Sequence, residues 1–162
     1  MATAYYDTAQ ICSNGHVANE SVKGVPERNS TFCATCGAPT VTKCSNCSAE
    51  IRGMYLPGGL AIIPPYHEPA YCHNCGKAYP WTDSKMEAAK ELIELDDRNS
   101  DAEKTALAAD LSDLVRDTPR TQVAATRFRK FVAKAASGTA SALRDIAVDI
   151  ASEAAKKTIF GP

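Results

Sequence analysis

Seven cysteines and one of the three histidines have the spacing of metal ligands. A Cys-x-x-Cys turn directs two thiolates at one ion and leaves two positions of a tetrahedral Zn²⁺ to be filled from elsewhere in the chain. Each such pair therefore needs a second pair. The first predicted zinc site comprises Cys12, His16, Cys33 and Cys36, and the second comprises Cys44, Cys47, Cys72 and Cys75.

The order of these pairs along the chain favours sequential sites. The loops that must close, from His16 to Cys33 and from Cys47 to Cys72, are short. The entropic penalty of closing a loop grows with its length, so neighbouring pairs are the preferred partners. A cross-braced arrangement, in which the first pair joins the third and the second joins the fourth, is the competing topology.

His16 completes the first set because no eighth cysteine exists and because it lies four residues after Cys12. The alternative is a turn histidine after Asn14-Gly15, with water or another residue as the fourth ligand. Two other histidines could act as ligands instead. His67 lies in a proline-rich loop, and His73 lies between Cys72 and Cys75. We expect both to be surface residues.

Thiol redox chemistry is the other common use of a Cys-x-x-Cys motif. It would require one active pair before a helix on a βαβ scaffold, and the sequence has no such pattern. Catalytic zinc keeps an open position for water, whereas four protein ligands leave none. The motifs therefore predict two structural zinc ions and no catalytic residues.

Residues around these ligands resemble a bacterial zinc-ribbon family of unknown function. The resemblance covers roughly residues 9–82 and includes residues that do not bind metal. It is carried by Ala9-Gln10-Ile11-Cys12, Asn14-Gly15-His16-Val17, Phe32-Cys33, Ile51-Arg52-Gly53, Tyr71 to Lys77 and Tyr79-Pro80-Trp81-Thr82. It implies a double zinc ribbon and no particular activity.

The composition predicts a cytoplasmic protein. Seven cysteines without an apolar leader at residues 1–10 favour a reducing compartment. The longest uncharged apolar stretch, residues 53–67, contains several prolines and glycines, so we expect no membrane span.

The chain divides by composition into two predicted parts, which make it α+β overall. Residues 1–82 are expected to form the double zinc ribbon, with small β-hairpins and almost no core besides the metals. Residues 83–162 are rich in Ala, Glu, Lys and Leu and are expected to form about four helices. We expect the apolar side chains of the loop to be buried, either against the rest of the protein or against a partner. These residues are Leu60, Ile62 and Ile63.

Local signals place the helices. Capping boxes at Ser84–Glu87 and Ser100–Glu103 indicate two helix starts, with 96–99 as the turn between them. Thr118-Pro119 indicates a third start, and 140–158 a final helix. Two apolar faces follow, one formed by Leu107, Leu111, Leu114 and Val115 and the other by Ala124, Phe128, Phe131, Val132 and Ala135.

The charges are unevenly distributed although the net charge is −1. Segment 83–117 is strongly acidic and segment 118–162 is basic, so the two should attract each other. A cationic stripe comprises Arg120, Arg127, Lys130 and Lys134. Phosphate binding is one interpretation of this stripe, and a solvated face neutralised by the acidic segment is the other.

No nucleophile–base pair, phosphate loop, carboxylate constellation or small-molecule site is recognisable. The sequence therefore predicts a non-enzymatic interaction or adaptor protein, with a protein partner or self-association through the wide apolar arc of the last helix. The alternative is a nucleic-acid-binding zinc ribbon, in which bases would stack on aromatic residues near the knuckles. Those aromatic residues are Tyr55, Tyr66, Tyr71, Tyr79 and Trp81.

Overall fold

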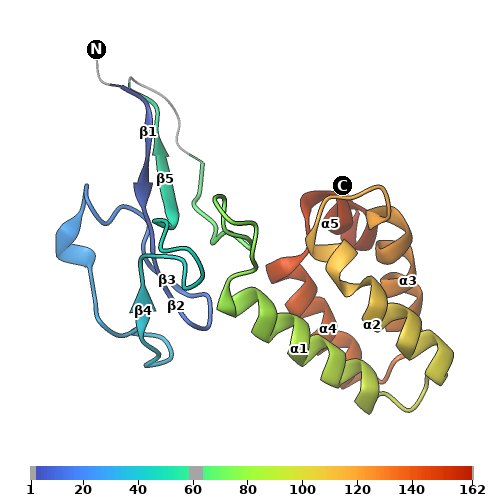
Figure 1. Ribbon diagram of the computed structural model, residues 1–162. Helices are drawn as coiled ribbons and strands as arrows, with labels where there is room; N and C mark the ends of the chain where they lie inside the picture. Colours follow the sequence, from blue (N-terminus) through green and yellow to red (C-terminus); the bar gives the residue numbers. More distant parts are fainter. Residues whose placement is uncertain (1–2, 59–63, 162) are drawn as a thin grey trace. The chain divides into compact units, whose positions relative to one another are not determined.

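The computed structural model describes residues 3–58 and 64–161. The chain forms two compact units, Met1–Asp83 and Ser84–Pro162. The fold is α+β, as the sequence predicts: short strands and cysteine clusters in the first unit and helices in the second (Figure 1). The loop residues Leu60, Ile62 and Ile63 lie outside the described residues.

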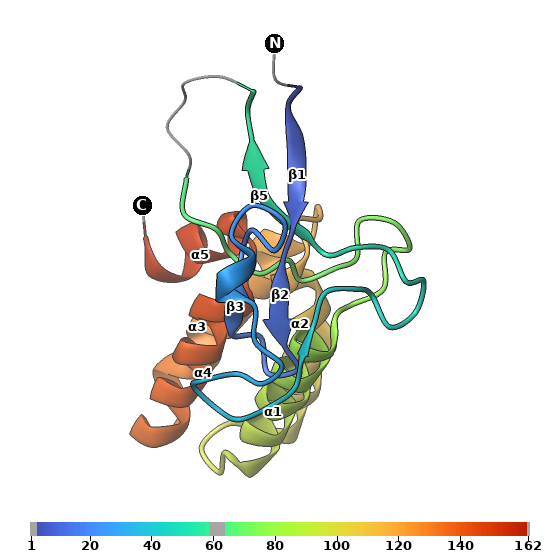
Figure 2. The ribbon, with the colours of Figure 1, turned by 90° about the vertical axis from the view of Figure 1, so that its left-hand side faces the viewer.

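Two small antiparallel sheets organise the first unit. One pairs β1 (Tyr5–Thr8) with β5 (Arg52–Leu56). The other has β2 (Gln10–Cys12) between β3 (Val17–Asn19) and β4 (Thr40–Val41), as Figure 2 shows. A single turn of 3₁₀ helix spans Pro26–Arg28. Strand β4 lies within segment 38–43, and β5 largely within segment 50–55; the residues of both segments favour extended structure.

The first unit has a small apolar core, which corrects the expectation that metal alone would replace one. Its largest members are Ile11, Ile51, Tyr79 and Trp81, each at most 2% exposed. The rings of Tyr79 and Trp81 stack with centroids 4.6 Å apart. Cys44 and Cys72 belong to the same cluster, so the apolar core and the cysteine-rich loops pack together.

Five helices, rather than about four, follow in the described part of the chain. They are α1 (Pro80–Leu95), α2 (Asp101–Val115), α3 (Thr121–Lys134), α4 (Ser137–Ile150) and α5 (Glu153–Phe160). The capping box at Ser100 is confirmed, because Ser100 and Glu103 exchange side-chain and backbone hydrogen bonds. The two predicted apolar faces of α2 and α3 are also confirmed, since all their residues are buried.

Three predicted helix boundaries are wrong, each for a local reason. Helix α1 begins at Pro80 rather than Ser84, because proline fits the first helical position and Thr82 donates its hydroxyl to the carbonyl of Ala70 at 2.9 Å. Helix α3 begins at Thr121 rather than Pro119, because Thr118 and Pro119 belong to a turn in which the Thr118 hydroxyl accepts the backbone N–H of Arg120 at 3.1 Å. The predicted helix over 140–158 is two helices, because Ser152 caps α5 and donates its backbone N–H to the carbonyl of Leu114 at 2.8 Å.

The apolar arc predicted for the last helix packs largely inside the second unit. Leu143, Ala147, Ala151 and Ala155 join the helical core, whereas Val148 is 51% exposed. Within the described residues, no helix is long and apolar enough to cross a membrane.

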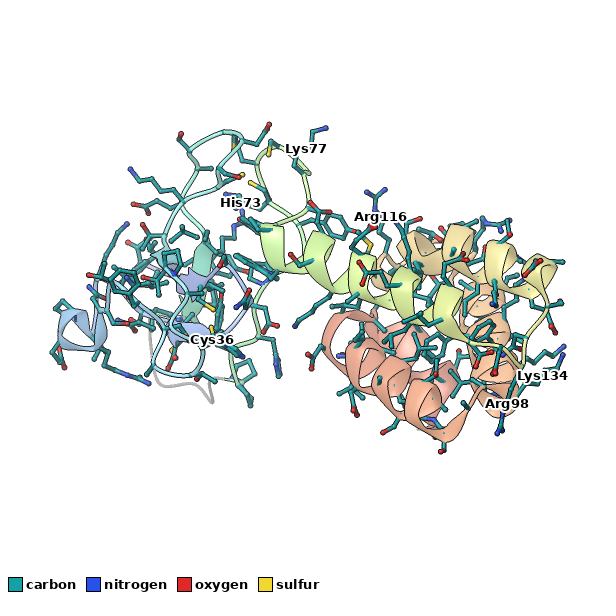
Figure 3. All side chains as sticks on the ribbon, turned by 90° about the horizontal axis from the view of Figure 1, so that it is seen from below. Cys36, His73, Lys77, Arg98, Arg116 and Lys134 are labelled. Carbon is teal, nitrogen blue, oxygen red and sulfur yellow. The ribbon has the colours of Figure 1, made fainter. Side chains whose placement is uncertain are left out.

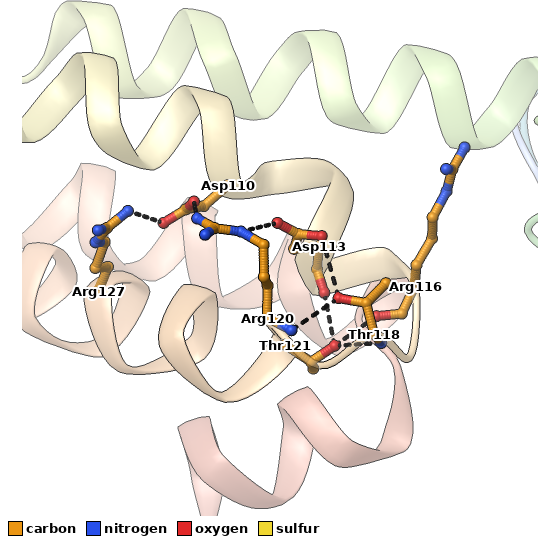
Figure 4. A network of polar contacts seen from close by, with 7 residues as sticks. All are labelled: Asp110, Asp113, Arg116, Thr118, Arg120, Thr121 and Arg127. Atoms are coloured by element: carbon orange, nitrogen blue, oxygen red, sulfur yellow. Dashed lines mark hydrogen bonds and ion pairs between the residues drawn. The ribbon is translucent and has the colours of Figure 1, made fainter.

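The cationic stripe is tied to the acidic side of α2 (Figure 4). Asp110 is only 2% exposed and bonds Arg120 at 3.1 Å and Arg127 at 2.6 Å. Arg120 also bonds Asp113 at 3.1 Å, and Lys134, labelled in Figure 3, pairs with Glu103. Most of the stripe therefore neutralises the acidic segment, which is the second of the two interpretations of these charges.

A buried carboxylate joins two connections of the helical unit. Asp96, 1% exposed, accepts hydrogen bonds from the backbone and side-chain N–H groups of Asn99 at 2.9 and 2.8 Å. Its other oxygen accepts the backbone N–H of Ala136, which precedes α4, at 3.1 Å. Burial alone raises the pKa of Asp96, but the hydrogen bonds from Asn99 and Ala136 outweigh it and hold the pKa below its ordinary value.

We predict that Asp96→Asn destabilises the helical unit in a pH-dependent way. The lowered pKa means that the ionised carboxylate contributes stability above its unfolded-state pKa of about 3.9 and loses it as the pH falls further. At neutral pH the variant should lose about 2 kcal/mol of unfolding free energy, the value of charge-assisted hydrogen bonds. Urea unfolding followed by far-UV circular dichroism measures this loss.

The difference between wild type and Asp96→Asn should shrink as the pH falls below about 4. Asp97→Asn is the matched control, because Asp97 is an exposed neighbour and should show no loss at either pH. Equal destabilisation by both substitutions would contradict the role assigned to Asp96.

Candidate metal centres

The three Cys-x-x-Cys loops, called knuckles below, share one backbone geometry. In each, the backbone N–H of the first cysteine donates a hydrogen bond to the carbonyl of the fifth residue after it. The carbonyl of the same cysteine accepts a hydrogen bond from the backbone N–H of the fourth residue after it. The bonds measure 2.8–2.9 Å in the loops that begin at Cys33, Cys44 and Cys72. A β-bridge closes each loop at the flanking residues, namely Phe32 with Pro39, Lys43 with Glu50, and Tyr71 with Ala78.

This geometry requires left-handed backbone at the residue after the second cysteine. Gly37 and Gly76 occupy that position with φ of 70° and 68°, a conformation that glycine adopts without steric penalty. The middle knuckle has Ser48 there, with φ of 60°. A side chain is disfavoured in this conformation because its Cβ approaches the backbone carbonyl.

The first cluster brings together Cys12, His16, Cys33 and Cys36, whose ligand atoms all lie within 4.8 Å of one another. The Sγ atoms of Cys12 and Cys36 are 3.8 Å apart. His16 presents Nδ1, which lies 3.6, 3.3 and 3.7 Å from the sulfurs of Cys12, Cys36 and Cys33. Cys12 is held at the end of β2, and the turn Asn14-Gly15 returns His16 to it.

The second cluster brings together Cys44, Cys47, Cys72 and Cys75, again with all ligand atoms within 4.8 Å. Its two sulfur–sulfur distances across the knuckles are 3.8 Å, between Cys44 and Cys75, and 3.7 Å, between Cys47 and Cys72. The grouping in both clusters is therefore sequential, and the cross-braced grouping is not formed. His67 and His73 are exposed and belong to neither cluster. Figure 3 labels His73.

The spacing of the ligand atoms fits tetrahedral coordination. With metal–sulfur bonds of about 2.3 Å, two sulfurs of a tetrahedron lie about 3.8 Å apart, and a sulfur and an imidazole nitrogen about 3.6 Å apart. A disulfide would need about 2.05 Å, and all seven cysteines are free. Both clusters can hold a metal ion.

Hydrogen bonds prepare several sulfurs for a cation. The backbone N–H of Ala38 and the side chain of Asn14 lower the pKa of the Cys36 thiol to about 6. The backbone N–H of Cys75 lowers the pKa of the Cys72 thiol to about 6, although burial acts in the opposite direction. Burial instead raises the pKa of Cys12, which is fully buried. A bound cation would deprotonate such a thiol.

Asparagines two residues after a cysteine contact sulfur in both clusters, a feature the sequence reasoning missed. The Asn14 side-chain amide donates to Cys36 at 3.4 Å, and that of Asn74 donates to Cys47 at 3.5 Å. A bond from the side chain of Asn46 helps to lower the pKa of Cys75. The recurring Cys-x-Asn in three of the four ligand pairs was the available signal.

Most of the aromatic residues expected to stack bases are buried or hydrogen-bonded within the protein. Tyr79 and Trp81 are buried, and Trp81 donates its indole N–H to the carbonyl of Pro69 at 2.9 Å. Tyr66 donates its hydroxyl to the carbonyl of Arg52 at 2.7 Å. Among the five residues, Tyr55 alone is exposed, at 46%; Tyr66 and Tyr71 are half-buried.

These observations define a two-unit protein with two cysteine-rich clusters that can hold metal ions in one unit and a helical second unit. Residues 5–159 match a family described as an uncharacterized protein conserved in bacteria (DUF2321), and the chain belongs to that family. The match spans both units and is thus longer than the resemblance over residues 9–82. No curated protein and no solved structure matches the chain.

We predict that introducing a glycine and removing one at equivalent knuckle positions change the unfolding free energy in opposite directions. Ser48→Gly should raise the unfolding free energy of the first unit by about 0.5–1 kcal/mol, because it relieves left-handed strain. Gly37→Ala should lower it by about 1 kcal/mol through conformation alone, since an added Cβ meets nothing within 4 Å. Denaturant unfolding of the metal-loaded protein measures both effects, and shifts of the same sign would contradict the prediction.

We also predict that Asn74→Ala accelerates metal release from the second cluster. Its amide donates to a ligand sulfur, and removing such an outer partner typically weakens metal binding about 10- to 100-fold. Transfer of the bound metal from the loaded protein to a chromogenic chelator measures the rate. Thr35→Ala is the matched control, because Thr35 holds the same knuckle position and no described hydrogen bond joins its side chain to sulfur. Equal rates for both variants would count against the prediction.

Proposed function

We propose that this protein is a non-enzymatic adaptor whose first unit is a double zinc ribbon holding two structural Zn²⁺ ions. The observation that carries the proposal is the pair of four-ligand clusters, each with ligand atoms within 4.8 Å of one another. Zinc is the metal that tetrahedral Cys₃His and Cys₄ sets typically hold. Four protein ligands close the coordination sphere and leave no position at which zinc could activate water.

Metal is expected to stabilise the first unit rather than to act on a substrate. The strands of this unit have two to five residues each, and such short sheets have little stability of their own. Where a site forms only in the folded chain, the free energy of metal binding contributes to folding. In a reducing cytoplasm the seven free cysteines would remain available to the metals.

The role as an adaptor follows from what the two units offer to other molecules. The zinc sites are closed, and the sequence contains no recognisable catalytic constellation. Exposed aromatic side chains such as Tyr6 and Tyr55 remain on the first unit, and the apolar side chain of Val148 remains exposed on α4. A protein partner is therefore favoured. Self-association through α4 is less supported, because most of its apolar arc is already covered.

Nucleic-acid binding is the less favoured role. Arg120, Arg127 and Lys134 form ion pairs with carboxylates of α2, and Tyr79 and Trp81 are buried. These groups are unavailable for phosphate contacts and base stacking, which dominate binding to single strands.

Elemental analysis of the purified protein tests the zinc assignment. We predict two Zn²⁺ ions per chain and loss of one ion in Cys44→Ser, because this variant lacks a ligand of the second cluster. Ser45→Ala, an exposed change in the same knuckle, should retain both. Fewer than two ions in the wild type, or another metal, would overturn the assignment.

Affinity capture tests the adaptor role. The zinc-loaded chain should retain a defined protein from a bacterial lysate, and stripping the metal with a chelator should abolish retention. Retention of nucleic acid in a strongly salt-dependent manner would instead support the rival role.

A further inference from the structure

A cationic and aromatic platform, formed by Tyr6, Arg52 and Tyr55, lies on the β1–β5 sheet and includes no member of the two cysteine clusters. Tyr6 and Tyr55 pair directly across the two strands, with ring centroids 4.9 Å apart. The guanidinium of Arg52 lies over the ring of Tyr6, 4.8 Å from its centroid. Tyr6 and Tyr55 are 51% and 46% exposed, so their rings are accessible to another molecule.

A β-bulge places these three side chains together. Tyr6 pairs with Tyr55 and Thr8 with Arg52, so β5 advances three residues while β1 advances two. In a regular strand, residues three apart point to opposite faces, and the extra residue brings Arg52 to the face of Tyr55. Gly53 lies within this bulge, where a Cβ would approach the carbonyl oxygen of Glu20 to 2.3 Å.

The platform forms one side of a groove of about 360 Å³. Prolines and Tyr66 supply much of the remaining wall, and Tyr66 is fixed there by its hydrogen bond to the carbonyl of Arg52. Besides Tyr6, Arg52 and Tyr55, the lining residues include Pro64, Pro65, Tyr66, His67 and Pro69.

The free polar groups of the platform are mainly hydrogen-bond donors. In the described parts of the chain, no hydrogen-bond partner is found for the hydroxyls of Tyr6 and Tyr55 or for the guanidinium of Arg52. The guanidinium can only donate, and a phenol readily donates. A matching ligand therefore offers apolar rings or rims together with unpaired acceptors. A proline-rich segment has this chemistry, because its carbonyls lack internal partners and proline has no N–H.

The charges near the groove disfavour a polyanion. Burial, and then the negative charges of Glu68 and Glu20, raise the pKa of the Tyr66 hydroxyl in this wall; Glu20 also pairs with Arg28 at 3.3 Å. Arg52 is the one arginine or lysine in the lining. A single-stranded nucleic acid would bring several phosphates against these carboxylates, whereas an uncharged extended peptide would not.

We propose that the groove formed by Tyr6, Arg52 and Tyr55 binds a proline-rich extended segment of a partner protein. Aromatic-lined grooves recognise such polyproline II segments, whose preformed conformation reduces the entropic penalty of binding. The inference rests on the proposed adaptor role and names its partner by chemistry.

The test is fluorescence polarisation of a labelled oligoproline with the full-length, zinc-loaded protein. Wild type should bind it, and Tyr6→Ala should weaken binding about tenfold, as expected for an aromatic anchor. Tyr6→Phe, which keeps the ring and removes one donor, should weaken it by a smaller factor. Tyr5→Ala is the matched control, because Tyr5 is the adjacent residue of β1, is equally exposed at 50%, and lies outside the groove.

Oligoproline binding that Tyr5→Ala weakens as much as Tyr6→Ala, absence of oligoproline binding, or binding of an oligothymidylate in its place would each overturn the inference. Zinc content measured on the same samples separates the two proposals. Two ions per chain without peptide binding would refute the groove alone, whereas failure to retain zinc would refute the proposed zinc ribbon.

Discussion

Eight ligand atoms gathered into two tight clusters are the constraint on which the first unit depends. Sulfurs 3.7–3.8 Å apart without a covalent bond repel one another once ionised. Several are nevertheless biased toward the thiolate by N–H groups of their own knuckles, as the lowered pKa values of Cys36 and Cys72 show. Such an arrangement stores negative charge that a divalent cation would neutralise. The strands, β-bridges and left-handed turns fix the positions of the cysteine sulfurs in these clusters.

The second unit is stabilised mainly by an apolar core rather than by clustered cysteines. Its core is apolar, formed by helices α1 to α5, and its polar interactions stabilise connections and helix surfaces. Asp96 satisfies backbone N–H groups at two loops, and Asp110 is buried beneath two arginines. Removing one partner of such a pair leaves an uncompensated charge, which is strongly destabilising. The charge asymmetry of the sequence is thus mainly an internal feature of this unit.

Features encoded by short-range spacing could be predicted from the sequence. Cysteine pairs three residues apart identify the knuckles, Gly37 and Gly76 identify their turns, and leucine periodicity identifies the buried face of α2. Features that depend on distant pairing were missed. Strand β1 has no strong local signal and is defined by β5, more than forty residues away. The helix break at Ser152 depends on the carbonyl of Leu114, and the small ribbon core depends on Trp81, which lies beyond the last cysteine.

The position of Trp81 has a spectroscopic consequence. It is the only tryptophan of the chain, it is 1% exposed, and it shares a packed cluster with Cys44 and Cys72 of the second metal centre. Thiolates and a stacked tyrosine ring both influence the emission of an indole. The protein therefore carries an intrinsic fluorophore packed against the second cysteine cluster, so that metal binding there would be observable optically without a label.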